Sequence, residues 1–241
     1  MSILFLDIAT IPDFELGARL YNLHDLSEKD IARVMFTKSR EKADGSDELS
    51  QNLLQATAIS LLLQDDDGIS LQTSGGPQAD ELQHLHFLTS LIDQHKPEII
   101  TWDSRRILPV LNYRCLSYGI RTPLAKSPAV IDLNAELSGF DQQGSGSLYE
   151  MAILSSLPGI EKMSDQNVLN ACLEGGHELI RIYLELRVIN TCLIHQRWQL
   201  VCGEIDHSSY EKQFQLLKDY LLKKDQTHLT NFIDALNEGA S

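Results

Sequence analysis

The fold of this chain depends on the stretch Ile3-Leu4-Phe5-Leu6-Asp7-Ile8-Ala9-Thr10-Ile11-Pro12-Asp13. Its first four residues form a continuous apolar run that is too short for a helix, and the segment around Pro12 breaks the pattern. A short run that is apolar at every position is typical of a strand buried on both faces. The sequence therefore predicts a central strand that ends in a carboxylate, Asp7.

Strand and helix patterns alternate through the first half of the chain. The Asp67-Gly68 pair between two strand patterns is typical of a hairpin turn. Ser27 is a candidate N-cap, with Asp30 three residues later. The periodicity predicts helices over residues 27–42, 78–94 and 108–118, and strands over residues 53–63, 69–71, 99–102 and 130–133.

The second half of the chain reads as helical beyond a flexible loop at residues 142–147. The expected helices are 148–155, 165–173, 177–202, 208–222 and 227–237. Strands first and helices last predict an α/β fold with a mixed β-sheet flanked by helices and a helical C-terminal portion. We expect one domain over residues 1–205 and a C-terminal helical extension, 206–241, that packs on it.

Charge and cysteine content restrict the function classes. The chain has 34 acidic and 20 basic residues, a net charge of −14, so as a whole it repels a polyanion and leaves only a local basic patch for nucleic-acid contact. The four cysteines form no Cys-x-x-Cys pair and indicate reduced thiols, without zinc or disulfides. No signal peptide or membrane span is indicated, which predicts a cytoplasmic protein with no membrane partner.

Three segments resemble the exonuclease motifs of bacterial proteins related to the 3'-5' exonuclease domain of family B DNA polymerases. They are Asp7 to Asp13, Thr101-Trp102 with Leu108-Pro109-Val110-Leu111 and Tyr113-Arg114, and Tyr183-Leu184-Glu185 through Val188-Ile189-Asn190-Thr191. The likeness extends to Pro158-Gly159 and to Arg197-Trp198-Gln199-Leu200 with Gly203. The resemblance implies a ribonuclease H-like fold and, in the active family, two Mg or Mn ions held by four carboxylates.

The chain departs from this pattern at three of the four acidic positions. The family's first motif has an aspartate and then a glutamate, where this chain has Asp7 and Ala9. Ile107 stands at the acid of the second motif, and Arg187 replaces the aspartate four residues after the motif tyrosine, Tyr183. The resemblance thus leaves Asp7 as the remaining family ligand. Tyr183 is either what remains of the third motif or simply an aromatic side chain packed on a buried helix.

Arg187 changes the electrostatics expected of the site. Its guanidinium would oppose a divalent ion by several kcal/mol, about 4 kcal/mol for unit charges ~4 Å apart at an effective dielectric constant of ~20. We expect Arg187 to take the metal position and pair with Asp7, preferably through a bidentate fork. Arg105 and Arg106 are expected beside the same cleft, where they either bind an anion with Arg187 or are solvated surface residues.

Two further aspartates are weighed as ligands. Asp103 would serve as a displaced second-motif ligand only if the preceding strand slipped in register. Asp132 fits a helix N-cap better than a ligand.

The leading prediction is a catalytically inactive exonuclease-like protein without a cofactor, which binds single-stranded nucleic-acid 3' ends or a protein partner. One alternative is an active metal-dependent 3'-5' exonuclease on single-stranded DNA or RNA with a rebuilt site. Another is a structural scaffold, because fold alone does not select a function.

Overall fold

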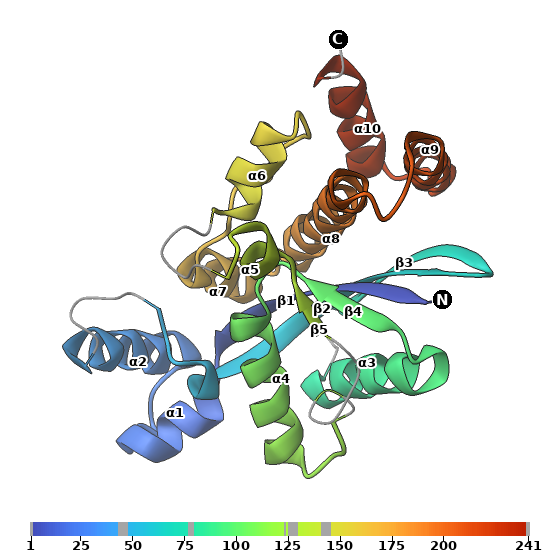
Figure 1. The fold of residues 1–241 in the computed structure, drawn as a ribbon. Helices are drawn as coiled ribbons and strands as arrows, with labels where there is room; N and C mark the ends of the chain where they lie inside the picture. The colour runs from blue at the N-terminus through green and yellow to red at the C-terminus, as the bar shows by residue number, and fades with distance from the viewer. Residues whose placement is uncertain are drawn as a thin grey trace.

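A computed structural model gives the structure of residues 2–42, 48–76, 80–122, 124, 130–140 and 146–239. Within these residues, five strands form one mixed sheet in the order β3-β2-β1-β4-β5 (Figure 1). The strands are β1 (Ile3–Pro12), β2 (Leu54–Asp65), β3 (Gly68–Gly75), β4 (Glu98–Thr101) and β5 (Val130–Asp132). The predicted central position of β1 is confirmed: it pairs antiparallel with β2 and parallel with β4.

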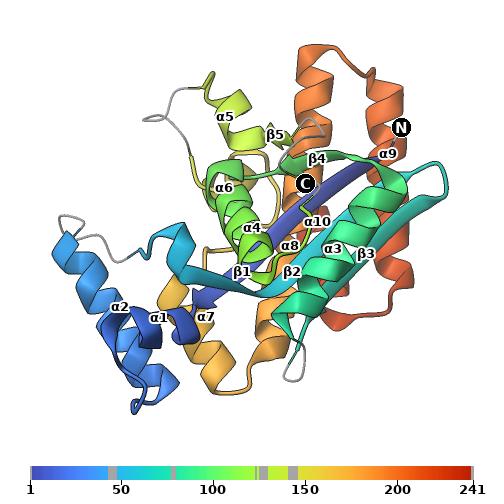
Figure 2. The ribbon, with the colours of Figure 1, turned by 90° about the horizontal axis from the view of Figure 1, so that it is seen from below.

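Helices cover both faces of the sheet, as Figure 2 shows. Helices α3 and α4 lie on one face, and α7 and α8 lie on the other. The α1–α2 pair extends from the end of β1 (Figure 1). The helices are α1 (Phe14–Tyr21), α2 (Glu28–Lys42), α3 (Glu81–His95), α4 (Ser104–Tyr118), α5 (Leu133–Leu137), α6 (Leu148–Leu154), α7 (Asp165–Leu173), α8 (His177–Cys202), α9 (His207–Lys223) and α10 (Thr227–Gly239), with a 3-10 turn η1 (Gln51–Leu53).

The side chains of β1 alternate between two cores. Phe5 packs in the core beneath α8, whereas Leu4 and Leu6 pack in the core beneath α3 and α4. Because side chains on a strand alternate with a period of two, Asp7 lies on the same face as Phe5 and points toward α8. The register between β1 and β2 shifts between Ala9 and Thr10, just beyond Asp7 along the strand.

Most elements predicted from the sequence are confirmed within one to three residues. The prediction that the first strand ends at Asp7 is wrong, because Thr10, Ile11 and Pro12 still pair with β2 and β1 continues to Pro12. Strand β3 likewise extends to Gly75, four residues beyond its predicted end. Helix α4 instead begins at Ser104, four residues early, because the Asp103 side chain caps it and Pro109 lies inside it. Helix α1 was not predicted; its N-cap is Asp13, whose carboxylate accepts from the Leu16 amide at 2.9 Å. In the loop expected at residues 142–147, residues 142–145 lie outside the described part of the chain.

A buried ion cluster ties the end of β1 to both helices on the α3 and α4 face. Arg114 of α4 donates through Nε to both Glu81 carboxylate oxygens, at 3.0 and 2.9 Å, and through Nη1 to Asp13. Glu81 also accepts from the Ala56 amide at 2.6 Å. Burial raises the pKa of Glu81 despite Arg114. The cluster therefore fixes the β1 terminus against β2, α3 and α4.

Helix α8 carries a buried histidine, His195, close to the central strand. Its ring contacts the Phe5 ring edge to face, with 5.5 Å between centroids. Burial lowers the pKa of His195 to about 4, because the surrounding apolar side chains disfavour the charged imidazolium. His195 is therefore neutral at pH 7.

Helices α9 and α10 pack on α8, and their apolar side chains join the same core as Phe5. The proposed division at residue 205 stays a prediction. No helix of the described residues combines the length and apolar character needed to cross a membrane. The mixed sheet, its flanking helices and the helical C-terminal part confirm the expected α/β, ribonuclease H-like fold class.

Candidate functional site

A cavity of about 300 Å³ opens beside the middle of β1. Asp7, Ile8, Ala9 and Thr10 form one wall, and Tyr183 and Arg187 of α8 form another. Residues at the start of α4, α6 and α7 line much of the rest: Asp103, Arg106, Ile107, Ser147, Leu148, Tyr149, Asp165 and Val168. The remaining lining residues are Trp102, Asn134, Gly146, Lys162 and Met163.

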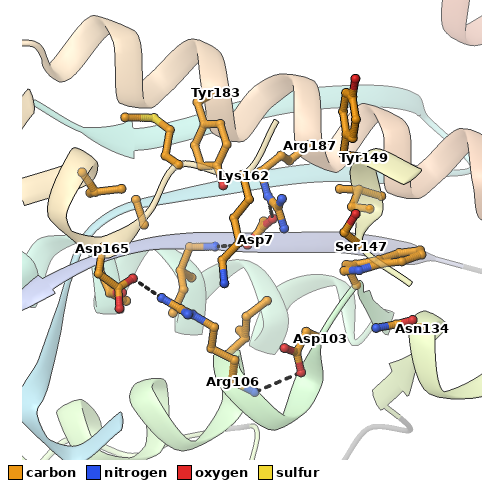
Figure 3. A pocket seen from close by; sticks show the side chains of 18 of the residues that line it. Asp7, Asp103, Arg106, Asn134, Ser147, Tyr149, Lys162, Asp165, Tyr183 and Arg187 are labelled. Atoms are coloured by element: carbon orange, nitrogen blue, oxygen red, sulfur yellow. Dashed lines mark hydrogen bonds and ion pairs between the residues drawn. The ribbon is translucent and has the colours of Figure 1, made fainter. Parts of the chain in front are cut away.

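Asp7 and Arg187 form an ion pair in this cavity (Figure 3). Arg187 Nε donates to Asp7 Oδ2 at 2.6 Å, and the Ile8 amide donates to Asp7 Oδ1 at 2.8 Å. The side chains are 13% and 8% exposed, so the pair is shielded from water. The expected pairing is therefore confirmed, although as a single hydrogen bond rather than a bidentate fork.

Tyr183 lies one helical turn before Arg187 and contacts it. The Arg187 guanidinium carbon lies 5.3 Å from the centroid of the Tyr183 ring, a cation–π distance. Burial by itself would lower the pKa of Arg187, but Asp7 and Tyr183 raise it, and the net direction is upward. Burial raises the pKa of Tyr183, so its hydroxyl stays protonated at neutral pH.

A second group of charges lies across the cavity from Arg187. Arg106 donates through Nη2 to Asp165, and its Nη1 lies 3.6 Å from Glu48. Lys162 Nζ donates to Glu48 at 3.1 Å. Figure 3 shows the Lys162 side chain extending between Asp7 and Arg106. Burial would lower the pKa of Arg106, but Asp165, Glu48 and Asp7 raise it.

The structure also shows where the other positions singled out in the sequence lie: some are packed in a core and some cap a helix. Ala9 is 3% exposed and Ile107 is also 3% exposed, both packed in apolar cores. Asp103 lines the cavity and caps α4 through the Arg106 amide at 3.3 Å. Asp132 caps α5 through the Ala135 amide at 2.9 Å, which confirms the N-cap interpretation. No register slip is present between β1 and β4 that would move Asp103 to the motif position.

The three arginines expected at the cleft are not equivalent. Arg106 and Arg187 line the same cavity. Arg105 is exposed and lines an adjoining hollow together with Arg106 and Lys162. A binding role for these residues stays a prediction.

The donor set does not fit two divalent metal ions. Among the described residues that line the cavity, three carboxylates (Asp7, Asp103, Asp165) face three cations (Arg106, Lys162, Arg187). Mg²⁺ and Mn²⁺ require several oxygen ligands with surplus negative charge. One oxygen of Asp7 already accepts from Arg187, and one oxygen of Asp165 accepts from Arg106. The lining is balanced in charge without any added cation.

The sequence interpretation missed Lys162 and Asp165. Asp165 is the first residue of α7, Lys162 lies in the loop just before it, and Ser164 caps the helix between them. The predicted helix start at residue 165 is correct, but the pattern gives no indication of what the helix end faces. Oδ2 of Asp165 is a buried acceptor without a hydrogen-bond partner, a position that the sequence does not mark.

Fold and cavity together define a ribonuclease H-like protein whose central-strand aspartate faces a cleft beneath the long helix α8. A family model described as a predicted 3'-5' exonuclease related to the exonuclease domain of PolB matches residues 46–128 and 125–236. The chain belongs to this family, which confirms the resemblance. Strand β1 with Asp7 lies outside the matched residues, so membership does not depend on that motif. No curated protein matches the chain.

Proposed function

We propose that this exonuclease-related protein binds single-stranded nucleic-acid 3' ends without hydrolysing them. The observation that carries the proposal is the hydrogen bond from Arg187 Nε to Asp7 Oδ2 at 2.6 Å. Two-metal hydrolysis needs the aspartate oxygens to hold cations that activate water and stabilise the leaving oxygen. An arginine that is always charged takes one of those oxygens in this chain.

The cavity supports binding of an end rather than the middle of a strand. Its volume of about 300 Å³ is at the low end for small-molecule sites, so it accepts about one nucleotide unit. Trp102, Tyr149 and Tyr183 supply aromatic surface in its lining, which suits a nucleobase. Arg106, Lys162 and Arg187 supply donors for phosphate oxygens.

The test uses a labelled single-stranded oligonucleotide with magnesium or manganese. We expect no shortening of the substrate, together with binding that weakens as salt increases. A circular strand of the same sequence should bind more weakly than the linear one, because it offers no end to the cavity.

Matched variants separate the cavity from the rest of the surface. Arg106→Gln should weaken binding of the linear strand, whereas Arg121→Gln, at a side chain 82% exposed, should not. Stepwise shortening by the wild type that disappears in Asp7→Asn would instead establish an active exonuclease with a rebuilt site. Equal affinity for linear and circular strands, or no binding, would refute end recognition.

A further inference from the structure

The cavity continues into a line of hollows that reaches α2. Lys162 and Asp165 belong both to the cavity and to a neighbouring hollow that also includes Arg40 and Glu48. That hollow shares Phe36, Arg40 and Gln166 with a third one, which extends along α2 to Arg33 and Lys29. Residues of α7 form the opposite side, so the path runs between α2 and α7.

Positive charge is concentrated along this path. In the described part of the chain, the cavity and its adjoining hollows are lined by seven cations and four carboxylates, a surplus of three positive charges on a chain whose net charge is −14. The cations are Lys29, Arg33, Arg40, Arg105, Arg106, Lys162 and Arg187, and the carboxylates are Asp7, Glu48, Asp103 and Asp165. Residues 43–47, after α2, lie outside this count.

The cations of α2 are arranged as a stripe. Lys29, Arg33 and Arg40 are exposed, and all three border the hollow between α2 and α7. At about 1.5 Å of rise per residue, Lys29 and Arg40 are roughly 17 Å apart along the helix. Asp30 lies 3.9 Å from Arg33, but an ion pair this exposed holds its side chains only weakly, so Arg33 can turn toward a ligand. The partner that this geometry fits is an elongated polyanion.

We propose that a single strand whose 3' end occupies the cavity continues between α7 and α2, with its phosphates along Lys162, Arg33 and Lys29. The proposal rests on the end binding proposed above and adds the route of the strand. A strand is favoured over an acidic protein segment because the line of positive charge begins inside a cavity whose volume of about 300 Å³ suits one nucleotide. Site sizes of single-strand grooves span about 4–16 nucleotides, which this path can accommodate.

The experiment compares two oligonucleotide lengths on the whole protein. A strand of about 16 nucleotides should reach α2, whereas one of about 4 should remain near the cavity. The double variant Lys29→Gln with Arg33→Gln removes two positive charges from the path between α2 and α7, which is called the track below. The control Lys212→Gln with Lys223→Gln removes two exposed charges from α9, so both variants have the same net charge.

The binding constant K is measured by fluorescence anisotropy at several salt concentrations, and the slope of log K against log salt reports the number of phosphate contacts. Each single-strand phosphate contact contributes about −0.7 to the slope of log K against log salt, so the α2 variant should lose about 1.4 of that slope with the long strand. Between about 50 and 200 mM salt, the wild type should then lose roughly sevenfold more affinity than the variant. The short strand should bind both equally.

The other outcomes are decisive as well. A long strand that binds the α2 variant and the α9 control with the same slope overturns the track, even if linear strands still bind better than circular ones. A slope loss with equal binding of linear and circular strands supports the track and overturns the end pocket. Preferred binding of polyglutamate over the long strand overturns the nucleic-acid assignment in favour of an acidic protein segment. No binding of any strand overturns both proposals.

Discussion

Replacing Asp7 by asparagine should destabilise the protein strongly. Asparagine keeps the size of the side chain and an acceptor for the Ile8 amide, but leaves Arg187 charged and without its anion. The two side chains are 8% and 13% exposed, and breaking a buried pair by removing one partner costs about 3–5 kcal/mol. For a chain of this size, such a loss lowers the melting temperature by about 6–20 °C.

A double-mutant cycle measured by urea unfolding isolates the pair. Arg187→Met removes the charge that Asp7→Asn leaves unpaired. The double variant should therefore lose at least about 2 kcal/mol less free energy of unfolding than the sum of the losses of the two single variants. Arg121→Met, whose partner Asp93 is 3.8 Å away in an exposed pair, is the control and should change stability by less than about 1 kcal/mol.

The sign of the effect distinguishes this site from a metal site. Carboxylates gathered to hold cations repel one another when no ion is bound, so neutralising one of them would stabilise the metal-free protein. An Asp7→Asn variant as stable as the wild type, or more stable, would refute the ion-pair reasoning. A rise in the wild-type melting temperature with magnesium would refute it as well, since saturation at about 100 times Kd contributes about 2.7 kcal/mol.

Two further predictions concern the rest of the fold. Arg114→Met should cost about 3–5 kcal/mol in urea unfolding, because it leaves Glu81 and Asp13 buried without their cation; a loss no larger than that of Arg121→Met would contradict this. The pKa of His195 is about 4 in the fold against about 6.5 when unfolded, so the unfolded chain takes up the proton first and stability falls as pH decreases from 6.5 toward 4, by about 3 kcal/mol. His195→Gln should flatten that decrease in stability, whereas the control His86→Gln, at an exposed histidine, should not. If both variants show the same dependence of stability on pH, His195 is not its cause.

The fold was largely predictable because its elements have strong local signals. The apolar run of β1, the predicted Asp67-Gly68 turn and the long helices each specify structure within a few residues, and the structure places that turn one residue earlier, at Asp66-Asp67. Helix α1 escaped prediction because Pro12 and Asp13 read as a break, whereas Asp13 both caps the helix and joins the Arg114 cluster. That second role depends on residues about a hundred positions away, which no local pattern contains.

The candidate site was predictable only where family spacing fixes the positions. Asp7 and Arg187 are 180 residues apart, and their pairing followed from the motif positions rather than from either local sequence. Lys162 and Asp165 carry no motif spacing, and they reach the cavity because the loop before α7 passes β1. The carboxylate partners of Arg106, Asp165 and Glu48, come from two different segments, so its surroundings depend on tertiary structure alone.

The position of Arg187 on α8 lets one side chain determine the electrostatics around Asp7. It lies one turn after Tyr183, on the helix face directed at β1, and its guanidinium reaches Asp7 inside the cavity. Its charge is fixed at every accessible pH and, unlike a bound ion, does not dissociate. Asp7 is thereby held in one orientation, and Arg106 and Lys162 add two further positive donors to the lining of the same cleft. If the proposed function holds, this arrangement separates the binding of a strand end from its cleavage, two steps that a metal site couples.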